Sequence, residues 1–410
     1  MVEKLAINGG NPIRKVPIYY GHQCIDEDDV NAVVQVLKSD CLTCGPEIAR
    51  LEKRLCEVTG AKYAVAVSNG TAALHAACYA ANIGNGDEVI TSPLTFAASA
   101  NCILYVGGKP VFADIDPDTY NIDPESIKKH ITKKTKAVIG VDFTGQAVEL
   151  DEICSICKKH HLILIEDAAH SIGTVYKGKP VGSIADLTTF SFHPVKTITG
   201  GEGGAVLTND ERLYHRLLLF RSHGITRSTD YMELDSESKD NIGKWYYQQI
   251  ALGFNYRITD IQAALINSQL EKLVSFKKRR QEIVDLYNEA FKNFPGVILQ
   301  KEISASDTAW HLYIIQMDLK KLSVGRKEIF DALWEENVCG NVHYIPVYYF
   351  PYYQKLGYRK GLCPKAEALY ERIITIPLYP AMSDADVDSV IVAVKKVVGF
   401  YSIYKKQQSV

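Results

Sequence analysis

The chain has 410 residues, 23% of them charged, and a formal net charge of -2 at pH 7, which is typical of a globular protein with a large buried core. No basic stripe that could follow a phosphate backbone stands out, so we expect no nucleic-acid partner. The N-terminus has no apolar signal segment, and no run approaches the ~18 apolar residues that span a bilayer. From these features we expect a cytoplasmic protein with no membrane partner.

The first predicted elements are two helices. Residues 26–39 have helical spacing, with Asp26 near the N-cap. A second helix should begin at Pro46 and end before Gly60, because proline suits a first helical turn and glycine a C-cap. The apolar face of the first helix would carry Val30, Val33, Val34 and Leu37.

Between residues 63 and 166, short apolar runs alternate with helical patterns. Such alternation is typical of a mostly parallel sheet that is covered by helices. The strand candidates are residues 63–67, 88–91, 110–114, 136–143 and 162–166.

A different order of elements begins near residue 258. Residues 258–294 indicate one or two long helices, and the chain ends in a helix near residues 384–398. We therefore predict an α/β protein with two domains. The large domain, with the N-terminal segment, would span residues 1–257, and a smaller α+β domain residues 258–410. The polar residues 226–247 should form a long surface loop.

The ten cysteines are too few for a disulfide scaffold in a chain of this length. Cys41 with Cys44 and Cys154 with Cys157 each form a C-x-x-C pair. A structural zinc site would need both pairs together in tetrahedral geometry, and the second pair lies on a predicted helix. We expect reduced, partly buried thiols at both pairs and no metal site.

Lys196 stands in FSFHPVKTITGGEGG, residues 190–204, after a strand-like segment and before glycines that prevent a helix. A lysine in a desolvated pocket loses its proton more easily and becomes a nucleophile. Its most familiar use in proteins is a Schiff base with pyridoxal phosphate (PLP). A lone loop lysine is more often simply solvated, so this prediction depends on what accompanies it.

The other needs of a PLP site are met elsewhere in the sequence. Asp167, after a buried strand, could keep the pyridine nitrogen protonated. The turn at Gly70 and the helix that starts near Thr71 would supply N–H groups for the phosphate, and Ser191 a hydroxyl. Phe96 could cover the ring. Each feature alone has a common structural explanation, but their combination in this order favours a PLP enzyme.

The chain resembles the nucleotide-sugar aminotransferases of the DegT/StrS group, which are PLP enzymes of fold type I. The resemblance rests on SNGTAALH, TSPLTFAASAN, EDAAHS, FSFHPVK, GGEGGAV, GFNYRITDIQAA, HLY and VHYIPVY, which occur in this order along nearly the whole chain. It implies a mostly parallel sheet in a large domain, a smaller C-terminal domain, PLP as the cofactor and a homodimer.

The resemblance also implies roles for single residues. Lys196 would hold PLP covalently, and Asp167 would face its pyridine nitrogen. His170 stands where many relatives carry glutamine and would face the cofactor. The remaining cofactor contacts would come from Gly70, Thr71, Phe96, Ser191 and, from the neighbouring subunit, Asn255, so that the two subunits share their active sites.

Within this group, GKWYYQQIALGFNYRITDIQAALINSQL and VHYIPVYYFPYY are similar to segments of the pseudaminic acid pathway enzymes. The implied reaction moves an amino group from glutamate to C4 of a UDP-linked 4-keto-6-deoxy-N-acetylhexosamine, giving UDP-4-amino-4,6-dideoxy-N-acetyl-β-L-altrosamine. Thr43, His343 and Tyr344 are the expected substrate contacts. The tyrosines that follow would line a sugar or uracil site or form a packing patch between domains: Tyr348, Tyr349, Tyr352 and Tyr353.

Other functions on the same scaffold stay open as alternatives. An aminotransferase for another keto nucleotide sugar, of the perosamine or 3-keto type, would use the same cofactor residues. A PLP sugar dehydratase of this fold has histidine in place of the lysine, so Lys196 argues against it. A non-catalytic regulator would be expected to lose Lys196 or Asp167, and both are present.

Overall fold

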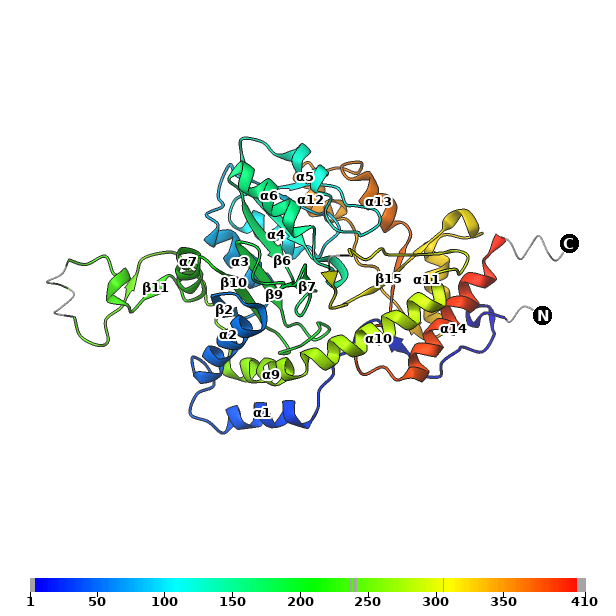
Figure 1. The fold of residues 1–410 in the computed structure, drawn as a ribbon, viewed down its shortest axis with the longest axis horizontal. Helices are drawn as coiled ribbons and strands as arrows, with labels where there is room; N and C mark the ends of the chain where they lie inside the picture. Colours follow the sequence, from blue (N-terminus) through cyan, green and yellow to red (C-terminus); the bar gives the residue numbers. More distant parts are fainter. Residues whose placement is uncertain (1–3, 236–237, 239–241, 305, 404–410) are drawn as a thin grey trace.

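A seven-stranded sheet lies at the centre of the larger part of the molecule (Figure 1). The computed structural model describes residues 4–403 except 236–237, 239–241 and 305. The strand order is β2-β10-β9-β6-β5-β3-β4, and within this sheet β10 alone runs antiparallel to its neighbours. The predicted mostly parallel sheet is confirmed, and each predicted strand forms close to its expected bounds. The strands are β2 Tyr63–Val67, β3 Glu88–Thr91, β4 Lys109–Phe112, β5 Thr135–Val141, β6 Ile163–Asp167, β9 Leu187–Ser191 and β10 Gly204–Thr208.

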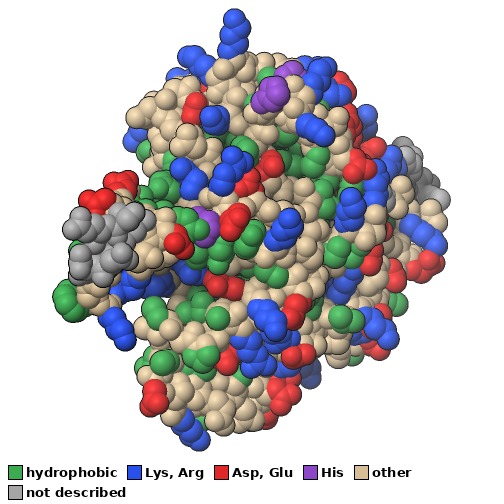
Figure 2. Space-filling view, turned by 60° about the vertical axis from the view of Figure 1, so that its left-hand side comes forward, with side chains coloured by type: hydrophobic (Ala, Val, Ile, Leu, Met, Phe, Trp, Pro, Cys, Tyr) green, Lys and Arg blue, Asp and Glu red, His purple; other side chains and the backbone are tan. Residues whose placement is uncertain are grey.

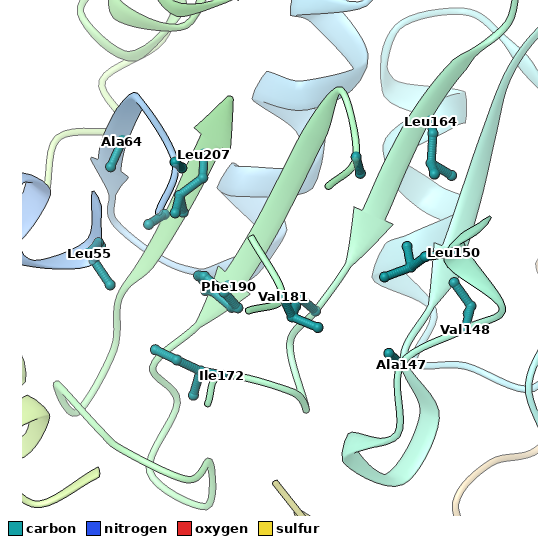
Figure 3. Close-up of a cluster of buried hydrophobic side chains, with 14 of the residues drawn as sticks. Leu55, Ala64, Ala147, Val148, Leu150, Leu164, Ile172, Val181, Phe190 and Leu207 are labelled. Carbon is teal, nitrogen blue, oxygen red and sulfur yellow. The ribbon is translucent and has the colours of Figure 1, made fainter. Parts of the chain in front are cut away.

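Helices cover both faces of this sheet, because alternate strand residues point to opposite sides. On one face Val65 packs among residues of α3, α4 and α7. On the other face Ala64 and Phe190 pack among residues of α2, α6 and α9, and Figure 3 shows Leu55 and Leu150 beside the strands there. The helices are α1 Glu27–Leu37, α2 Pro46–Thr59, α3 Gly70–Ala80, α4 Ala98–Tyr105, α5 Pro124–His130, α6 Leu150–His160, α7 Glu211–Arg221, α9 Asp260–Glu271, α10 Leu273–Phe291, α11 Arg326–Glu335, α12 Pro351–Lys355, α13 Pro364–Tyr370 and α14 Asp384–Phe400.

The C-terminal part has its own core around a three-stranded antiparallel sheet, β13-β15-β17, with α10, α11 and α14. Leu5 and Ile18 of the N-terminal segment lie in this same core, and β1 pairs with β16. In contrast, α9 packs on α1 and α2 of the larger part. The division between residues 257 and 258 stays a prediction. The remaining strands are β1 Ile18–Tyr19, β7 Val175–Tyr176, β8 Lys179–Pro180, β11 Ile225–Thr226, β12 Gln248–Gln249, β13 Val297–Leu299, β14 Ser306–Asp307, β15 Tyr313–Met317, β16 Val338–Cys339 and β17 Ile373–Ile376.

Helices α1 and α2 form as predicted, but the predicted apolar face of α1 is only half correct: Val33 and Val34 are partly buried, whereas Val30 and Leu37 are not. Val30 and Leu37 are 46% and 55% exposed in this chain. The buried residues of the helix are Val36 and the polar Asp29, which faces α9. The Asp29 carboxylate accepts a hydrogen bond from Gln269 (2.6 Å) and pairs with Lys272 (2.8 Å). Polar contacts of Asp29 therefore act beside apolar packing in docking this helix.

The described residues of the predicted loop at 226–247 belong to an arm, which we define as the described part of residues 225–249 and which stands away from the body (Figures 1 and 2). The arm leaves and re-enters through the antiparallel pair β11 and β12. Two large apolar side chains near its second half are strongly exposed, Trp245 (79%) and Leu252 (77%). On the face drawn in Figure 2, positive and negative side chains are mixed and form no single-sign field.

Membrane-spanning helices and disulfide bonds are both absent from the described residues. No described helix is long and apolar enough to cross a membrane, and the cellular location stays a prediction. No cysteine is joined in a disulfide. Cys154 is partly buried and Cys157 buried, as expected. Cys41 and Cys44 are exposed, so the prediction of partly buried thiols is wrong for this pair, because both lie in the surface loop between α1 and α2.

Candidate active site

The residues predicted to bind a cofactor follow strands that end at one edge of the large sheet. Because β2, β3, β6 and β9 run in the same direction, their carboxyl ends share this edge, where α/β sheets bind ligands. Gly70 follows β2, Phe96 follows β3, Asp167 ends β6 and Ser191 ends β9. The fold thus brings together four residues that lie far apart in the sequence.

Lys196 lies in the turn that follows β9, at the same edge. Its backbone N–H donates a hydrogen bond to the carbonyl of His193 (2.9 Å). Burial lowers the pKa of the Lys196 ammonium to about 8, although the charge of Asp167 acts in the opposite direction. With such a pKa, roughly a tenth of the amine is neutral at pH 7, far more than for an ordinary lysine. Lys196 can therefore attack a carbonyl carbon.

The glycines after Lys196 let three segments pack closely together. An added Cβ at Gly200 would lie 2.7 Å from Cγ1 of Ile266 in α9. One at Gly204 would lie 2.5 Å from the carbonyl oxygen of Asn69, just before α3. Larger residues at either position would displace the turn or the helix start, so these glycines hold the lysine turn against α9 and α3.

Asp167 is a buried carboxylate with two hydrogen-bond donors. It is 4% exposed. Its Oδ2 accepts a hydrogen bond from Oγ of Ser99 (2.6 Å), and its Oδ1 accepts one from the N–H of Ala169 (3.2 Å). Burial raises the pKa of Asp167, whereas Ser99, Ala169 and the charge of Lys196 lower it. A carboxylate supplied in this way can hold a proton on a basic nitrogen placed opposite to it.

The start of α3 offers backbone N–H groups beside a hydroxyl. Asn69 caps the helix by accepting a hydrogen bond from the N–H of Ala72 (2.8 Å). Gly70 and Thr71 lie in the first turn, where the N–H groups have no partner within the helix and attract anions. An added Cβ at Gly70 would lie 3.0 Å from Oγ of Ser191. The hydroxyl therefore adjoins the helix start, and the two together fit a phosphate group.

Three buried histidines, His170, His311 and His343, lie within electrostatic reach of Lys196. The hydroxyl of Tyr344 and Nε2 of His170 share a hydrogen bond (3.2 Å), and the ring centroids of His170 and His311 are 4.5 Å apart. Burial, followed by the charge of Lys196, lowers the pKa of all three imidazoles, that of His343 to about 3. All three are therefore neutral at pH 7.

Three predicted site residues lie at the surface of the single chain. Phe96 is 62% exposed, and Thr43 and Asn255 are exposed as well. The backbones of Thr43 and Asn255 pair with Thr259 and Ser222, respectively. Neither pairing involves the cluster around Lys196, and the roles of Thr43 and Asn255 stay predictions.

The tyrosines after Tyr344 contribute to packing. Tyr348 and Tyr353 are buried in one cluster with Phe112 of the large sheet. Their hydroxyls donate hydrogen bonds to Glu367 (2.6 Å) and Asn101 (2.7 Å). Of the two roles considered for this group, packing therefore holds for these two residues.

Sequence reasoning missed Ser99 and His311. Ser99 stands in TFAASAN and His311 in HLY, and both motifs were noted without these residues being singled out. The contacts of Ser99 and His311 depend on the direction of a side chain from its backbone, which residue type alone does not give.

The cluster fits PLP. A lysine of lowered pKa can hold the aldehyde carbon, a buried carboxylate can face the pyridine nitrogen, and the start of α3 with Ser191 can hold the phosphate. In addition, Nδ1 of His170 is buried without a hydrogen-bond partner among the described residues. A buried nitrogen of this kind calls for a polar partner, which a group on the cofactor can supply.

Comparisons with known proteins agree with this chemistry. The model of the DegT/DnrJ/EryC1/StrS aminotransferase family matches residues 23–395. The spore coat polysaccharide biosynthesis protein SpsC of Bacillus subtilis is 43% identical over 381 residues, which cover 92% of this chain and 96% of SpsC.

Two solved structures share the whole fold. PseC of Helicobacter pylori, an aminotransferase involved in the biosynthesis of pseudoaminic acid, is 34% identical with a TM-score of 0.86, over 94% of this chain and 100% of PseC. Spr1654 of Streptococcus pneumoniae, in the form with pyridoxamine phosphate (PMP), is 32% identical with a TM-score of 0.87, over 94% of this chain and 100% of Spr1654. Spr1654 has also been solved in a PLP form.

Proposed function

Because this chain belongs to the DegT/DnrJ/EryC1/StrS aminotransferase family and is a PLP-dependent sugar aminotransferase, we propose that it aminates C4 of a UDP-linked 4-keto-6-deoxy-N-acetylhexosamine, with glutamate as the donor. The product is UDP-4-amino-4,6-dideoxy-N-acetyl-β-L-altrosamine. The observation that carries this proposal is the similarity to PseC over 94% of this chain.

In this proposal, Lys196 and Asp167 perform the central tasks. When bound, PLP would supply an electron-withdrawing protonated ring, which is the chemistry that transfer of an amino group needs. Lys196 would hold the cofactor, and its Nζ would move a proton at the reacting carbon. A pKa of about 8 lets this amine both accept and donate a proton near neutral pH. Asp167 holds the proton on the pyridine nitrogen.

The remaining residues bind and orient. Gly70, Thr71 and Ser191 hold the phosphate, and Phe96 covers the ring. His170 faces the cofactor and is itself oriented by Tyr344 through their 3.2 Å hydrogen bond. On the substrate side, Thr43, His343 and Tyr344 contact the nucleotide sugar, and Nδ1 of His343 is held by the hydroxyl of Thr375 (2.9 Å).

A second candidate substrate is a different keto nucleotide sugar. SpsC, which acts in spore coat polysaccharide biosynthesis, is 43% identical to this chain, compared with 34% for PseC. This higher identity favours keeping other ketosugars, including those of the perosamine and 3-keto types, in any test of the substrate. The nucleotide is open to the same test.

The proposed active unit is a homodimer whose subunits share their sites. Support comes from what the single chain leaves uncovered. Phe96 is 62% exposed, although a ring that covers a cofactor would be enclosed, and Trp245 and Leu252 near the arm are exposed as well. Covering these side chains with a second copy would remove apolar surface from water. A second copy that covers them would bring its Asn255, at the base of the arm, to the phosphate.

The substrate is tested with purified holoenzyme, glutamate and a panel of ketosugars. The panel should contain UDP, dTDP and GDP sugars with ketones at C3 and C4, and products should be identified by mass spectrometry and NMR. We expect the highest kcat/KM with the UDP-linked 4-keto-6-deoxy-N-acetylhexosamine. A higher kcat/KM with a 3-keto or dTDP substrate would contradict the proposal, and Lys196→Ala supplies the blank.

The shared site is tested by mixing two inactive variants, Lys196→Ala and Asn255→Ala. In a mixed dimer with shared sites, one site carries both defects and the other carries none, so activity returns after subunit exchange. Exchange is verified with differently tagged chains. Confirmed exchange without recovery means that both residues serve one site from one chain. The test requires Asn255→Ala to be nearly inactive alone; if it is not, PLP affinity is the readout, and it should be regained at about half of the sites.

A further inference from the structure

Ser99 and Thr95 form a hydrogen-bond chain that ends on Asp167. Oγ of Ser99 lies 2.6 Å from Oδ2 of Asp167, and Oγ1 of Thr95 lies 2.7 Å from Oγ of Ser99. Thr95, Ser99 and Asp167 are 3%, 1% and 4% exposed, so water does not compete for these contacts. An ionised carboxylate only accepts, hence Ser99 donates its one proton to Asp167 and Thr95 donates to Ser99. The chain therefore has a single direction, toward the carboxylate.

The start of α4 places Ser99. Its N–H donates to the carbonyl of Phe96 (3.2 Å), so Phe96 and Ser99 belong to one turn. One turn later, the thiol of Cys102 points to the carbonyl of Ser99 (3.3 Å). The backbone of Ser99 is thus held on both sides, and a movement of this turn would move the backbone that carries Phe96 and the donor to Asp167 together.

We propose that Ser99, oriented by Thr95, is a positioning residue that keeps Asp167 ionised and aimed at the pyridine nitrogen of the cofactor. The inference rests on the proposed role of Asp167. A hydrogen bond to a charged group is roughly twice as strong as one between neutral groups, and a second donor behind the first strengthens it. Without Ser99, Oδ2 of Asp167 would lose its hydrogen-bond donor, and the buried carboxyl would favour the protonated form, which cannot hold a proton on the pyridine nitrogen.

The other groups that face Asp167 do not replace Ser99. Lys196 is the nearby cation, but once it is joined to the cofactor it no longer presents a free ammonium. The thiol of Cys102, the carboxyl of Asp142 and the phenol of Tyr344 also feel the charge of Asp167. Burial, reinforced by that charge, raises the pKa of each of these three groups, so they stay protonated at pH 7. Ser99 and the N–H of Ala169 are then the donors that remain to Asp167.

The test uses Ser99→Ala, Ser99→Thr and Thr95→Val in the full-length holoenzyme. Thr91→Val is the matched control, because it removes another buried hydroxyl, which donates to the carbonyl of Ile139 (3.2 Å) and does not contact Asp167. The readouts are the pH dependence of the cofactor absorbance, the dissociation constant of PLP from titration of the apoprotein, and kcat and KM.

We expect Ser99→Ala to lower kcat about tenfold or more and to weaken PLP binding several-fold. The midpoint pH of the change in cofactor absorbance, which we call the spectral transition, should shift. KM for the nucleotide sugar should stay within about twofold of the wild-type value. Ser99→Thr keeps the hydroxyl and should recover most of the loss. Thr95→Val should act in the same direction but less, by about threefold, because it reaches Asp167 only through Ser99. Thr91→Val should match the wild type.

The proposal is overturned if Ser99→Ala has the spectral transition, PLP affinity and kcat of Thr91→Val. Asp167→Asn, measured in parallel, separates this failure from that of the proposed function. If Asp167→Asn also leaves the spectrum and kcat unchanged, the role of Asp167 itself is wrong. If Asp167→Asn is impaired while Ser99→Ala is normal, only the inference about Ser99 is rejected. Should Ser99→Ala fail to fold, the near-isosteric Thr95→Val decides by the same readouts.

Discussion

Strand β6 ends in two neighbouring acids, Glu166 and Asp167, that meet opposite environments. Their side chains point to opposite faces of the sheet. Asp167 faces the site, where it has two donors and the charge of Lys196 nearby. Glu166 faces the core that contains Leu164. There it accepts a hydrogen bond from Thr188 (2.9 Å) and meets a second carboxyl, that of Asp142.

Burial acts in the same direction on both acids, but their neighbours differ. Burial raises the pKa of Glu166 to about 7, and burial together with the charge of Glu166 raises that of Asp142 well above its ordinary value. Two buried carboxyls with no cation paired to them among the described residues cannot both ionise, so this pair retains a proton at neutral pH. Burial raises the pKa of Asp167 as well, but Ser99, Ala169 and the charge of Lys196 act against this rise. The comparison teaches that two acids under the same burial differ in their neighbours: a cation stands beside Asp167, whereas a second carboxyl stands beside Glu166.

The largest effect should follow from removing Lys196, the cation beside Asp167. Lys196→Ala eliminates both the covalent link to PLP and the charge beside Asp167, so transamination should fall by several orders of magnitude. In the wild type, borohydride should fix the cofactor on the peptide that contains Lys196, as seen by mass spectrometry. Fixation on another lysine, or on none, would show that Lys196 is not the residue that binds PLP covalently.

Neutralising each acid in turn tests the comparison directly. Asp167→Asn should lower kcat on the order of 10²-fold or more, because the pyridine nitrogen loses the charge that keeps it protonated. Glu166→Gln, one residue earlier on the same strand, should leave kcat within about threefold. Steady-state kinetics on both variants decide. Near-normal turnover in Asp167→Asn, with only a raised KM for the sugar, would place Asp167 at the substrate instead.

The pH dependence of the free energy of unfolding should test the raised pKa of Glu166, the acid that faces the core. The pKa of Glu166 is raised from 4.5 to about 7 in the folded chain. Between these values the folded state binds more protons than the unfolded state, so the free energy of unfolding falls as pH rises through this window. The expected loss is on the order of 2–3 kcal/mol. Glu166→Gln should flatten this slope in urea unfolding of the apoprotein at pH 5 to 8.

An exposed acid supplies the control for this slope. Glu57→Gln removes a carboxyl that is 60% exposed on α2 and should keep the slope of the wild type. If Glu166→Gln also keeps it, the pair of Glu166 and Asp142 does not hold the proton.

The smallest effect should come from Ser171, which connects the buried acid pair of Glu166 and Asp142 to the turn that carries His170. The hydroxyl of Ser171 donates to Oδ2 of Asp142 (2.6 Å), directly after His170 in the chain. Ser171→Ala should lower the free energy of unfolding by about 1–2 kcal/mol, since a buried carboxyl oxygen loses a donor. We expect kcat to change less than about threefold. A loss of kcat as large as that of Ser99→Ala would mean that the core pair and the site are coupled through this turn.

Much of the site was predictable because strand ends are predictable. The apolar runs of β2, β6 and β9 identified where each strand stops, and parallel strands that stop at one edge bring their next residues together. Asp167 and Ser191 needed no more than this. The chain from Thr95 through Ser99 was not predictable, because it depends on the rotation of the first turn of α4 about its axis.

The errors have the same physical origin. The apolar pattern of α1 predicted a face that includes Val30 and Leu37, but the buried residues of this helix are Val36 and Asp29. Likewise, the exposure of Cys41 and Cys44 follows from the course of a loop rather than from residue type. Periodicity identifies that a helix forms, whereas the partner surface, distant in sequence, decides which side it turns inward.

The strand order also has a consequence for the making of the protein on the ribosome. In the large sheet, β2 pairs with β10 alone, and residues 68–203 separate the two. At ~5–20 residues per second, β2 waits roughly 7–30 s for its partner to be synthesised. During this time its edge is unpaired and open to aggregation. The anion-binding turn at Gly70 likewise lacks Ser191, so the nascent chain should capture PLP only after about half of the chain has been synthesised.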